Sequence, residues 1–154
     1  MARGRKYVNS NWVDKYGQTP IFLAIKEGNE GVVKPLLGRK EVKFDKPDSD
    51  GRTLLCCAAR NGHEAVVKIL LERGGVSLDK PDCDGQIPLW WAAQDGHEGV
   101  VKILLERDDA NLDKPDSADR TPLFWAAWNG HEGVVKTTVE PRSGRSLGMG
   151  MWGW

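Results

Sequence analysis

Three histidines are the side chains of this 154-residue chain best suited to chemistry near neutral pH. His63, His97 and His131 stand 34 residues apart, and histidine serves both as a zinc ligand and as a general base. Zinc needs its ligand nitrogens within about 2.1 Å of one ion, whereas equivalent residues of packed helices lie about 10 Å apart. We therefore expect no metal site, and a structural role in which each imidazole ties a helix start to the backbone of an adjacent loop.

The three cysteines are the next candidates for chemistry. Cys56 and Cys57 are neighbours in an apolar run, Cys83 stands alone, and no C-x2-C pair occurs. An odd number of cysteines without paired spacing favours neither a disulfide framework nor a zinc site. We expect all three to be buried as small apolar side chains.

Catalysis is not predicted either. A nucleophile, its base and an orienting acid form an asymmetric set that occurs once, whereas the polar residues that recur here do so in every unit. An enzyme would show one unrepeated polar cluster, and none is visible. The chain has no G-x-G-x-x-G or G-x-x-x-x-G-K-[ST] loop, so no cofactor is expected. Lys+Arg and Asp+Glu both total 22, which predicts no broad basic face for nucleic acid.

The histidines belong to a unit that repeats every 34 residues. The segment Asp48–Leu55 recurs at 82–89 and 116–123, with an earlier copy at 14–21, and the segment 62–72 recurs at 96–106. Each unit predicts a projecting turn, a short first helix that begins at Thr-Pro, and a second helix with an apolar stripe. A helical hairpin of this size cannot bury both faces alone, so neighbouring units must stack.

The unit resembles the ankyrin repeat, whose T-P-L-H-x-A signature matches Thr19-Pro20-Ile21 and Thr121-Pro122-Leu123. The resemblance implies an all-α ankyrin-repeat solenoid of stacked helix-turn-helix units with projecting hairpin loops. The family's histidine after T-P-L is replaced in the four units, by Phe22, Cys56, Trp90 and Phe124. The Asp-Lys-Pro turns and the Gly-His-Glu-Gly-Val-Val-Lys runs are similar to those of long fungal ankyrin arrays attached to nucleotide-binding signalling proteins.

The period divides the chain into six predicted segments. These are an N-terminal segment with a remnant of a preceding repeat (1–13), ankyrin repeats 1 (14–47), 2 (48–81) and 3 (82–115), a degenerate repeat 4 (116–140), and a disordered tail (141–154). The tail leaves two hypotheses open: it is out-of-frame coding of a longer array, or its Met and Trp residues anchor a partner or a membrane surface.

Both ends of the predicted stack are irregular. Pro35 falls inside the second helix of repeat 1, where we expect a kink or a fray. In repeat 4, Thr137 and Thr138 replace apolar residues of the second helix. Neither end offers a complete polar cap, so we expect marginal stability.

The resemblance implies a groove between the loop tips and the first helices, where residues that vary between repeats contact a partner. These residues are Tyr16, Gln18, Lys26, Asp50, Arg52, Arg60, Asn61, Asp84, Gln86, Gln94, Asp95, Arg120, Trp128 and Asn129. We expect Trp91 and Trp125 to pack between helices, whereas Trp90 is open to either role. Trp128 fits a binding hot spot or a random aromatic in a decayed repeat.

The function predicted from this pattern is a non-enzymatic protein-interaction module. The alternative is a regulatory or sensor fragment of a larger multidomain signalling protein. The N-terminus has no secretory signal, and apolar runs stop after about six residues, far below the roughly 20 of a membrane span. We expect a monomer inside the cell, in the cytoplasm or the nucleus.

Overall fold

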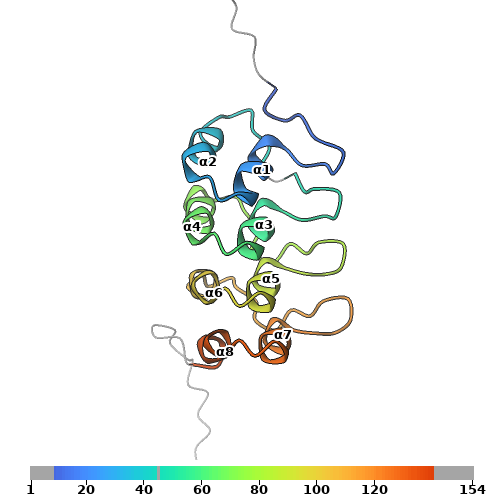
Figure 1. Ribbon diagram of the computed structural model, residues 1–154, viewed down its shortest axis with the longest axis vertical. Coiled ribbons are helices and arrows are strands. Elements are labelled where there is room, and N and C mark those ends of the chain that lie inside the picture. Colours follow the sequence, from blue (N-terminus) through green and yellow to red (C-terminus); the bar gives the residue numbers. More distant parts are fainter. Residues whose placement is uncertain (1–8, 45, 141–154) are drawn as a thin grey trace, which may run out of the picture.

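The computed structural model describes residues 9–44 and 46–140, which form eight helices and no strands. The helices are α1 (Pro20–Lys26), α2 (Glu30–Leu37), α3 (Leu54–Arg60), α4 (Glu64–Arg73), α5 (Pro88–Gln94), α6 (Glu98–Leu105), α7 (Pro122–Trp128) and α8 (Glu132–Val139). Figure 1 shows two columns, with the odd-numbered helices in one and the even-numbered helices in the other. We number the helical pairs 1 (α1–α2) to 4 (α7–α8). The predicted all-α solenoid is confirmed.

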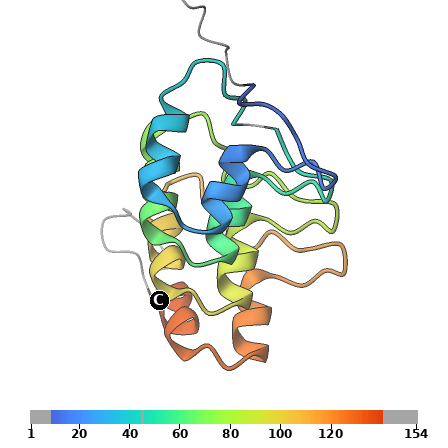
Figure 2. The ribbon, with the colours of Figure 1, turned by 45° about the horizontal axis from the view of Figure 1, so that its top comes forward.

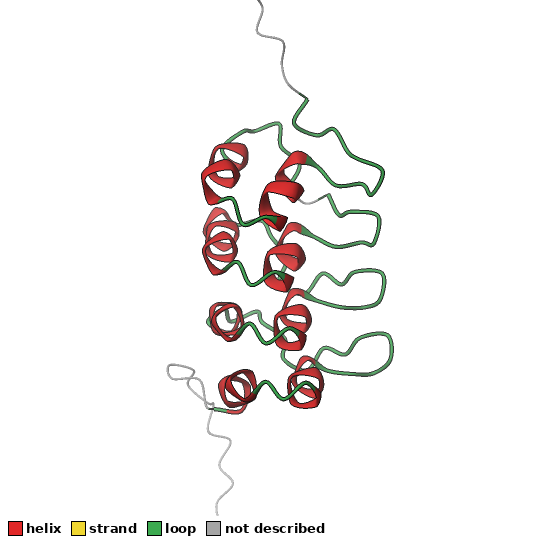
Figure 3. Ribbon diagram, viewed as in Figure 1, coloured by secondary structure: helices red, strands yellow, loops and turns green. Residues whose placement is uncertain are grey.

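The loops that precede the odd-numbered helices all project to one side of the stack (Figure 2). Figure 3 shows these loops beside the odd-numbered column and away from the even-numbered one. The 141–154 segment, for which we predicted disorder, lies outside the described residues. Among the described residues, none of the helices combines the length and the apolar character needed to cross a bilayer.

Helices α1 and α7 begin at Thr-Pro, as predicted, and α3 begins after Thr53 without a proline. Thr121 accepts a hydrogen bond on its side chain from the Phe124 N–H at 3.2 Å, and Pro122 occupies the first helical turn. Thr19 and Thr53 cap their helices in the same way. The exception is α5, where Ile87 stands at the cap and makes no such bond. Each short helix is followed by a glycine with positive φ, such as Gly130, so it stops after two turns.

Of the kink or fray that we expected at Pro35, the fray is not found. Helix α2 continues through Pro35 to Leu37, and the Gly38 N–H still donates to the Lys34 carbonyl at 3.2 Å. Proline removes only the bond that its own N–H would have made to Gly31, and both residues are exposed, so water can solvate the freed carbonyl.

The apolar core continues from pair to pair through two successive valines in each even-numbered helix. The first valine packs toward the preceding pair: Val66 and Val100 are fully buried, whereas Val32, which no described pair precedes, is 49% exposed. The second valine packs toward the following pair. Val101 is fully buried and Val135, in the last pair, is half-buried. Burial in this chain therefore depends on stacking, as the repeat pattern predicts.

One loop position distinguishes the last repeat from the others. Gly17, Gly51 and Gly85 have positive φ, and the equivalent Asp119 is the only described non-glycine residue with positive φ (60°). A Cβ added to Gly85 would lie 2.9 Å from the Ser117 nitrogen of the next loop. The side chain of Asp119 meets no such contact, because no described loop packs against this position.

We expect Asp119→Gly to raise the free energy of unfolding by about 0.5–1 kcal/mol, because glycine adopts positive φ without the steric cost of a side chain. Urea unfolding monitored by circular dichroism measures the change. Gly85→Asp is the matched control and should lower stability by at least about 2 kcal/mol, because it adds a steric clash to the backbone strain. A neutral effect of Gly85→Asp would contradict the close loop packing.

Candidate functional site

The loop before each odd-numbered helix is organised by one aspartate at its base. The Asp82 Oδ1 accepts hydrogen bonds from the N–H groups of Asp84 and Gln86, at 3.0 and 2.9 Å. The same pair of bonds is made in the other loops by Asp14, Asp48 and Asp116. This turn gives every loop one conformation and directs the residues at its tip outward.

The second oxygen of the aspartate secures the loop to neighbouring side chains. The Trp91 Nε1–H donates to Asp82 Oδ2 at 3.1 Å, so the loop is held on helix α5. The Asp116 Oδ2 accepts from Trp125 Nε1 at 3.4 Å and from Arg120 Nε at 3.1 Å. Loop and helix are therefore one rigid wall of the candidate site in these repeats.

Successive loops are also joined to one another. A backbone N–H of each loop donates to a carbonyl of the loop before it at 2.9 to 3.0 Å, in the pairs Ser49–Tyr16, Cys83–Asp50 and Ser117–Asp84. The loop tips form a continuous row, and residues that vary between repeats follow one another along it.

The histidines have the predicted structural role, but each bonds to the last residue of the preceding short helix and not to a loop. The His97 Nε2–H donates to the Arg60 carbonyl at 2.8 Å, at the end of α3 in the preceding pair. His63 and His131 make the equivalent bonds to the carbonyls of Lys26 and Gln94, at 3.0 and 2.8 Å. Each ring also lies against the glycine that ends the preceding short helix. The described residues contain no group of His, Cys, Asp or Glu that could hold a metal ion.

A hollow of about 260 Å³ lies between the loops and the first helices of pairs 1 and 2. It is lined by Gln18, Phe22, Lys26, Arg52, Cys57, Arg60 and Asn61, which come from two loops and from the ends of α1 and α3. We call the surface between the loop tips and the odd-numbered helices the groove. Three of the side chains lining its hollow are cationic and none is acidic.

Most of the predicted contact residues are exposed, and five of them, Gln18, Lys26, Arg52, Arg60 and Asn61, line the hollow. The exposed ones are Tyr16, Lys26, Asp50, Arg60, Asn61, Asp84, Asp95, Trp128 and Asn129, and the half-buried ones are Arg52, Gln86, Gln94 and Arg120. Gln18 is only 8% exposed, because it lies at the base of its loop, where its N–H donates to Asp14. It reaches the surface only as part of the lining of the hollow.

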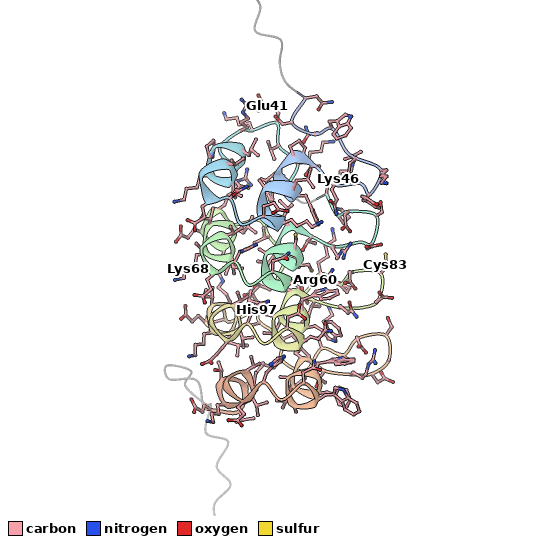
Figure 4. The ribbon with its side chains drawn as sticks, viewed as in Figure 1. Glu41, Lys46, Arg60, Lys68, Cys83 and His97 are labelled. Atoms are coloured by element: carbon pink, nitrogen blue, oxygen red, sulfur yellow. The ribbon has the colours of Figure 1, made fainter. Side chains whose placement is uncertain are left out.

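Arginines lie over the tryptophans of the odd-numbered helices. The Arg60 guanidinium lies 4.6 Å from the Trp91 ring centroid, and Arg120 lies 4.7 Å from that of Trp125. Figure 4 shows Arg60 on the odd-numbered column, with Lys68 on the even-numbered column at the opposite side of the molecule. Stacking fixes the Arg60 side chain at the edge of the hollow and leaves its N–H groups able to bind an anion.

Trp90, for which packing and partner contact were both open, packs in the core. Its indole is buried and meets Trp91 and Trp125 edge-to-face at centroid distances of 5.0 and 5.5 Å. The Trp90 Nε1–H and the Gln94 Oε1 on the same helix are both buried without a hydrogen-bond partner. Trp91 and Trp125 also pack between helices, as predicted, and both are half-buried.

Trp128 is the most exposed of the described tryptophans, at 73%. Its ring stacks on Phe124, with centroids 5.9 Å apart and planes inclined by 20°. The indole therefore extends an aromatic surface at the pair-4 end of the groove.

The prediction for the cysteines is right for two and wrong for the third. Cys56 and Cys57 are buried, and burial raises the pKa of their thiols to about 11 and about 12. Cys83 is exposed, because it occupies the edge of the loop, where its backbone N–H bonds to the Asp50 carbonyl. All three are free thiols.

The Asp116 carboxylate makes stability depend on pH. Burial acts to raise its pKa, but hydrogen bonds from the Arg120 and Ala118 N–H groups and from Trp125 prevail and lower the pKa below its ordinary value. A lowered pKa stabilises the folded state above the unfolded-state pKa of about 3.9, and this stabilisation is lost as the pH falls through the folded-state pKa. We expect the difference in urea midpoint between the native chain and Asp116→Asn to become smaller as the pH falls from about 6 to about 3. A constant difference would contradict this account.

Sequence reasoning missed the double role of the loop aspartates. They were interpreted as turn formers, and nothing in the local pattern showed that one oxygen would bind an indole nine residues later. The available signal was their spacing, because Asp14, Asp48, Asp82 and Asp116 keep the 34-residue period as strictly as the histidines do.

Comparison with known proteins adds one finding. A family model described as ankyrin repeats (3 copies) matches residues 5–82 and 74–143. No curated protein matches the chain at a significant level.

Proposed function

This chain belongs to the ankyrin repeat family, and on that basis we propose that it is a non-enzymatic module that binds another protein in its groove. Ankyrin repeats are generally protein–protein interaction modules. The observation that supports the groove is the hollow of about 260 Å³ between pairs 1 and 2, where predicted contact residues from two loops and two helices come together.

The charges around the hollow favour a partner that presents a carboxylate. Arg52 is paired with Asp48 at 3.0 Å and also with Asp50, so much of its charge is neutralised. Lys26 and Arg60 are exposed cations, and no carboxylate lines the hollow beside them. An aspartate or glutamate side chain of the partner would supply the missing negative charge.

The other end of the groove favours an apolar anchor. Trp128 and Phe124 present a stacked aromatic surface there, and Asn129 is held in place by a bond from its Nδ2 to the Gln94 carbonyl at 3.1 Å. Exposed aromatic residues beside fixed polar groups are typical of hot spots in protein interfaces. We propose that the partner extends along the groove from an acidic residue near pair 1 to an apolar residue near pair 4.

Affinity capture from the source cell tests this proposal. The native chain is compared with Arg60→Ala, with Trp128→Ala and with Lys68→Ala, whose side chain lies on the even-numbered column (Figure 4). We expect both groove variants to lose at least about tenfold of the captured partner, since hot-spot truncations cost about 1.4 kcal/mol or more, and the Lys68 variant to retain it. If Arg60→Ala captures as much partner as the native chain, the proposed carboxylate on the partner is contradicted. If all variants capture equal amounts, binding in the groove is contradicted.

A further inference from the structure

The last helical pair presents an apolar surface that every other pair buries. The end face consists of Leu123, Phe124, Ala127, Val135 and Val139, of which Phe124 is 43% and Val139 63% exposed. Nearly all the residues at the same positions in pairs 1 to 3 are buried under the following pair. Such a contiguous apolar face on a described surface marks an interaction site.

The end face also holds an unfilled space where an inner pair would receive a histidine. Gly28, Gly62 and Gly96 each lie against the imidazole of the following pair, whereas no described atom lies within 4 Å of a Cβ placed on Gly130. A hollow of about 240 Å³ opens here, lined by Ala127, Gly130, His131, Glu132, Val135 and Lys136. The hollow is large enough for one bulky apolar side chain.

A further repeat in the usual register would be crowded on this face. The Cβ of Asp119 lies where Gly85 leaves room for the next loop, whose backbone nitrogen would come within about 3 Å of it. The same crowding acts against a fifth repeat and against the first repeat of a second copy stacked in the same way. An occupant that covers the helices α7 and α8 without adding a loop beside Asp119 avoids it.

We propose that the chain's own residues 147–154 occupy the end face and place a tryptophan in the hollow beside Gly130. The segment contains Leu147, Met149, Met151, Trp152 and Trp154 and no charged residue. It follows α8, which ends at Val139 on the face itself. Fourteen residues after 140 reach about 45 Å when extended, several times the 8–10 Å between packed helices. The proposal does not depend on the partner of the groove, although Phe124 belongs both to the end face and to the aromatic surface with Trp128.

Disulfide trapping in the full chain tests the proposal. Cys83→Ser removes the exposed thiol, and the buried thiols of Cys56 and Cys57, with their raised pKa, compete poorly for oxidation. Leu123→Cys with Trp152→Cys places one thiol on the end face and one in the segment. Lys102→Cys with Trp152→Cys is the matched control, because Lys102 is exposed on α6, outside the end face.

In the variant that carries Leu123→Cys and Trp152→Cys, we expect an intramolecular disulfide whose yield does not depend on protein concentration. This yield should exceed that of the variant with Lys102→Cys and Trp152→Cys at least about tenfold. A disulfide between two chains would overturn the proposal in favour of a second copy. Equal disulfide yields in both cysteine variants would overturn it as well, because the segment would then have no preferred site.

Hydrogen exchange provides a second measurement in case a cysteine variant does not fold. Trp152→Ser with Trp154→Ser should speed exchange in α7 and α8 about tenfold and leave α3 and α4 unchanged. Unchanged exchange in α7 and α8 would overturn the proposal.

Discussion

Gly62→Ala is expected to lower the free energy of unfolding by about 3 kcal/mol. Gly62 has φ +71°, so a side chain would cost about 1–2 kcal/mol in backbone strain alone. The added Cβ would also lie 2.5 Å from Nδ1 of His97, which must move. Movement of the ring breaks its bond to the Arg60 carbonyl, worth about 1 kcal/mol, and loosens pair 3 on pair 2. Urea unfolding monitored by circular dichroism measures the loss.

Gly130→Ala is the control that separates the cost of backbone strain from the cost of the contact with a histidine ring. Gly130 has φ +73°, almost the same as Gly62, but no described atom lies within 4 Å of its would-be Cβ. We expect it to cost the strain, about 1–2 kcal/mol, without the loss of a histidine bond. Equal losses for the two variants would mean that the histidine contact adds nothing to the interface between pairs.

Asp82→Ala is expected to lower the free energy of unfolding by about 3 kcal/mol. The Asp82 carboxylate accepts bonds from the backbone N–H groups of Asp84 and Gln86 and from the Trp91 indole. Asp82 is buried, so alanine leaves these three donors without partners in a place that water reaches poorly. Thermal unfolding with probes in both the near and the far ultraviolet measures the loss and reports whether Trp91 changes its environment.

Asp82→Asn is the control. Its Oδ1 can still accept both backbone bonds, but its amide nitrogen would face the Trp91 Nε1–H, donor against donor. We expect a loss of about 1–2 kcal/mol, with the loop conformation kept and the indole released. A loss as large as that of Asp82→Ala would mean that the negative charge matters more than the turn.

The repeat architecture could be predicted because its cause is periodic. Glycine, proline and threonine at fixed intervals determine where each helix starts and stops, and the paired valines determine which faces are buried. The histidine bonds were predictable for the same reason, because a residue repeated at every junction acts at a junction.

The features that could not be predicted depend on pairs of residues far apart in sequence or on a missing neighbour. Gln18 and Tyr16 look alike as variable loop residues, yet one is buried and the other exposed. The stacking of Arg60 on Trp91 joins two repeats, and the sequence of neither repeat indicates it. Cys83 varies between repeats as a surface residue does, but its residue type favoured burial.

The histidine bonds have a consequence for the growing chain during synthesis. Each imidazole reaches back to a carbonyl 37 residues earlier. The carbonyls of Lys26, Arg60 and Gln94 therefore lack their imidazole partners until the histidine of the next pair has been translated.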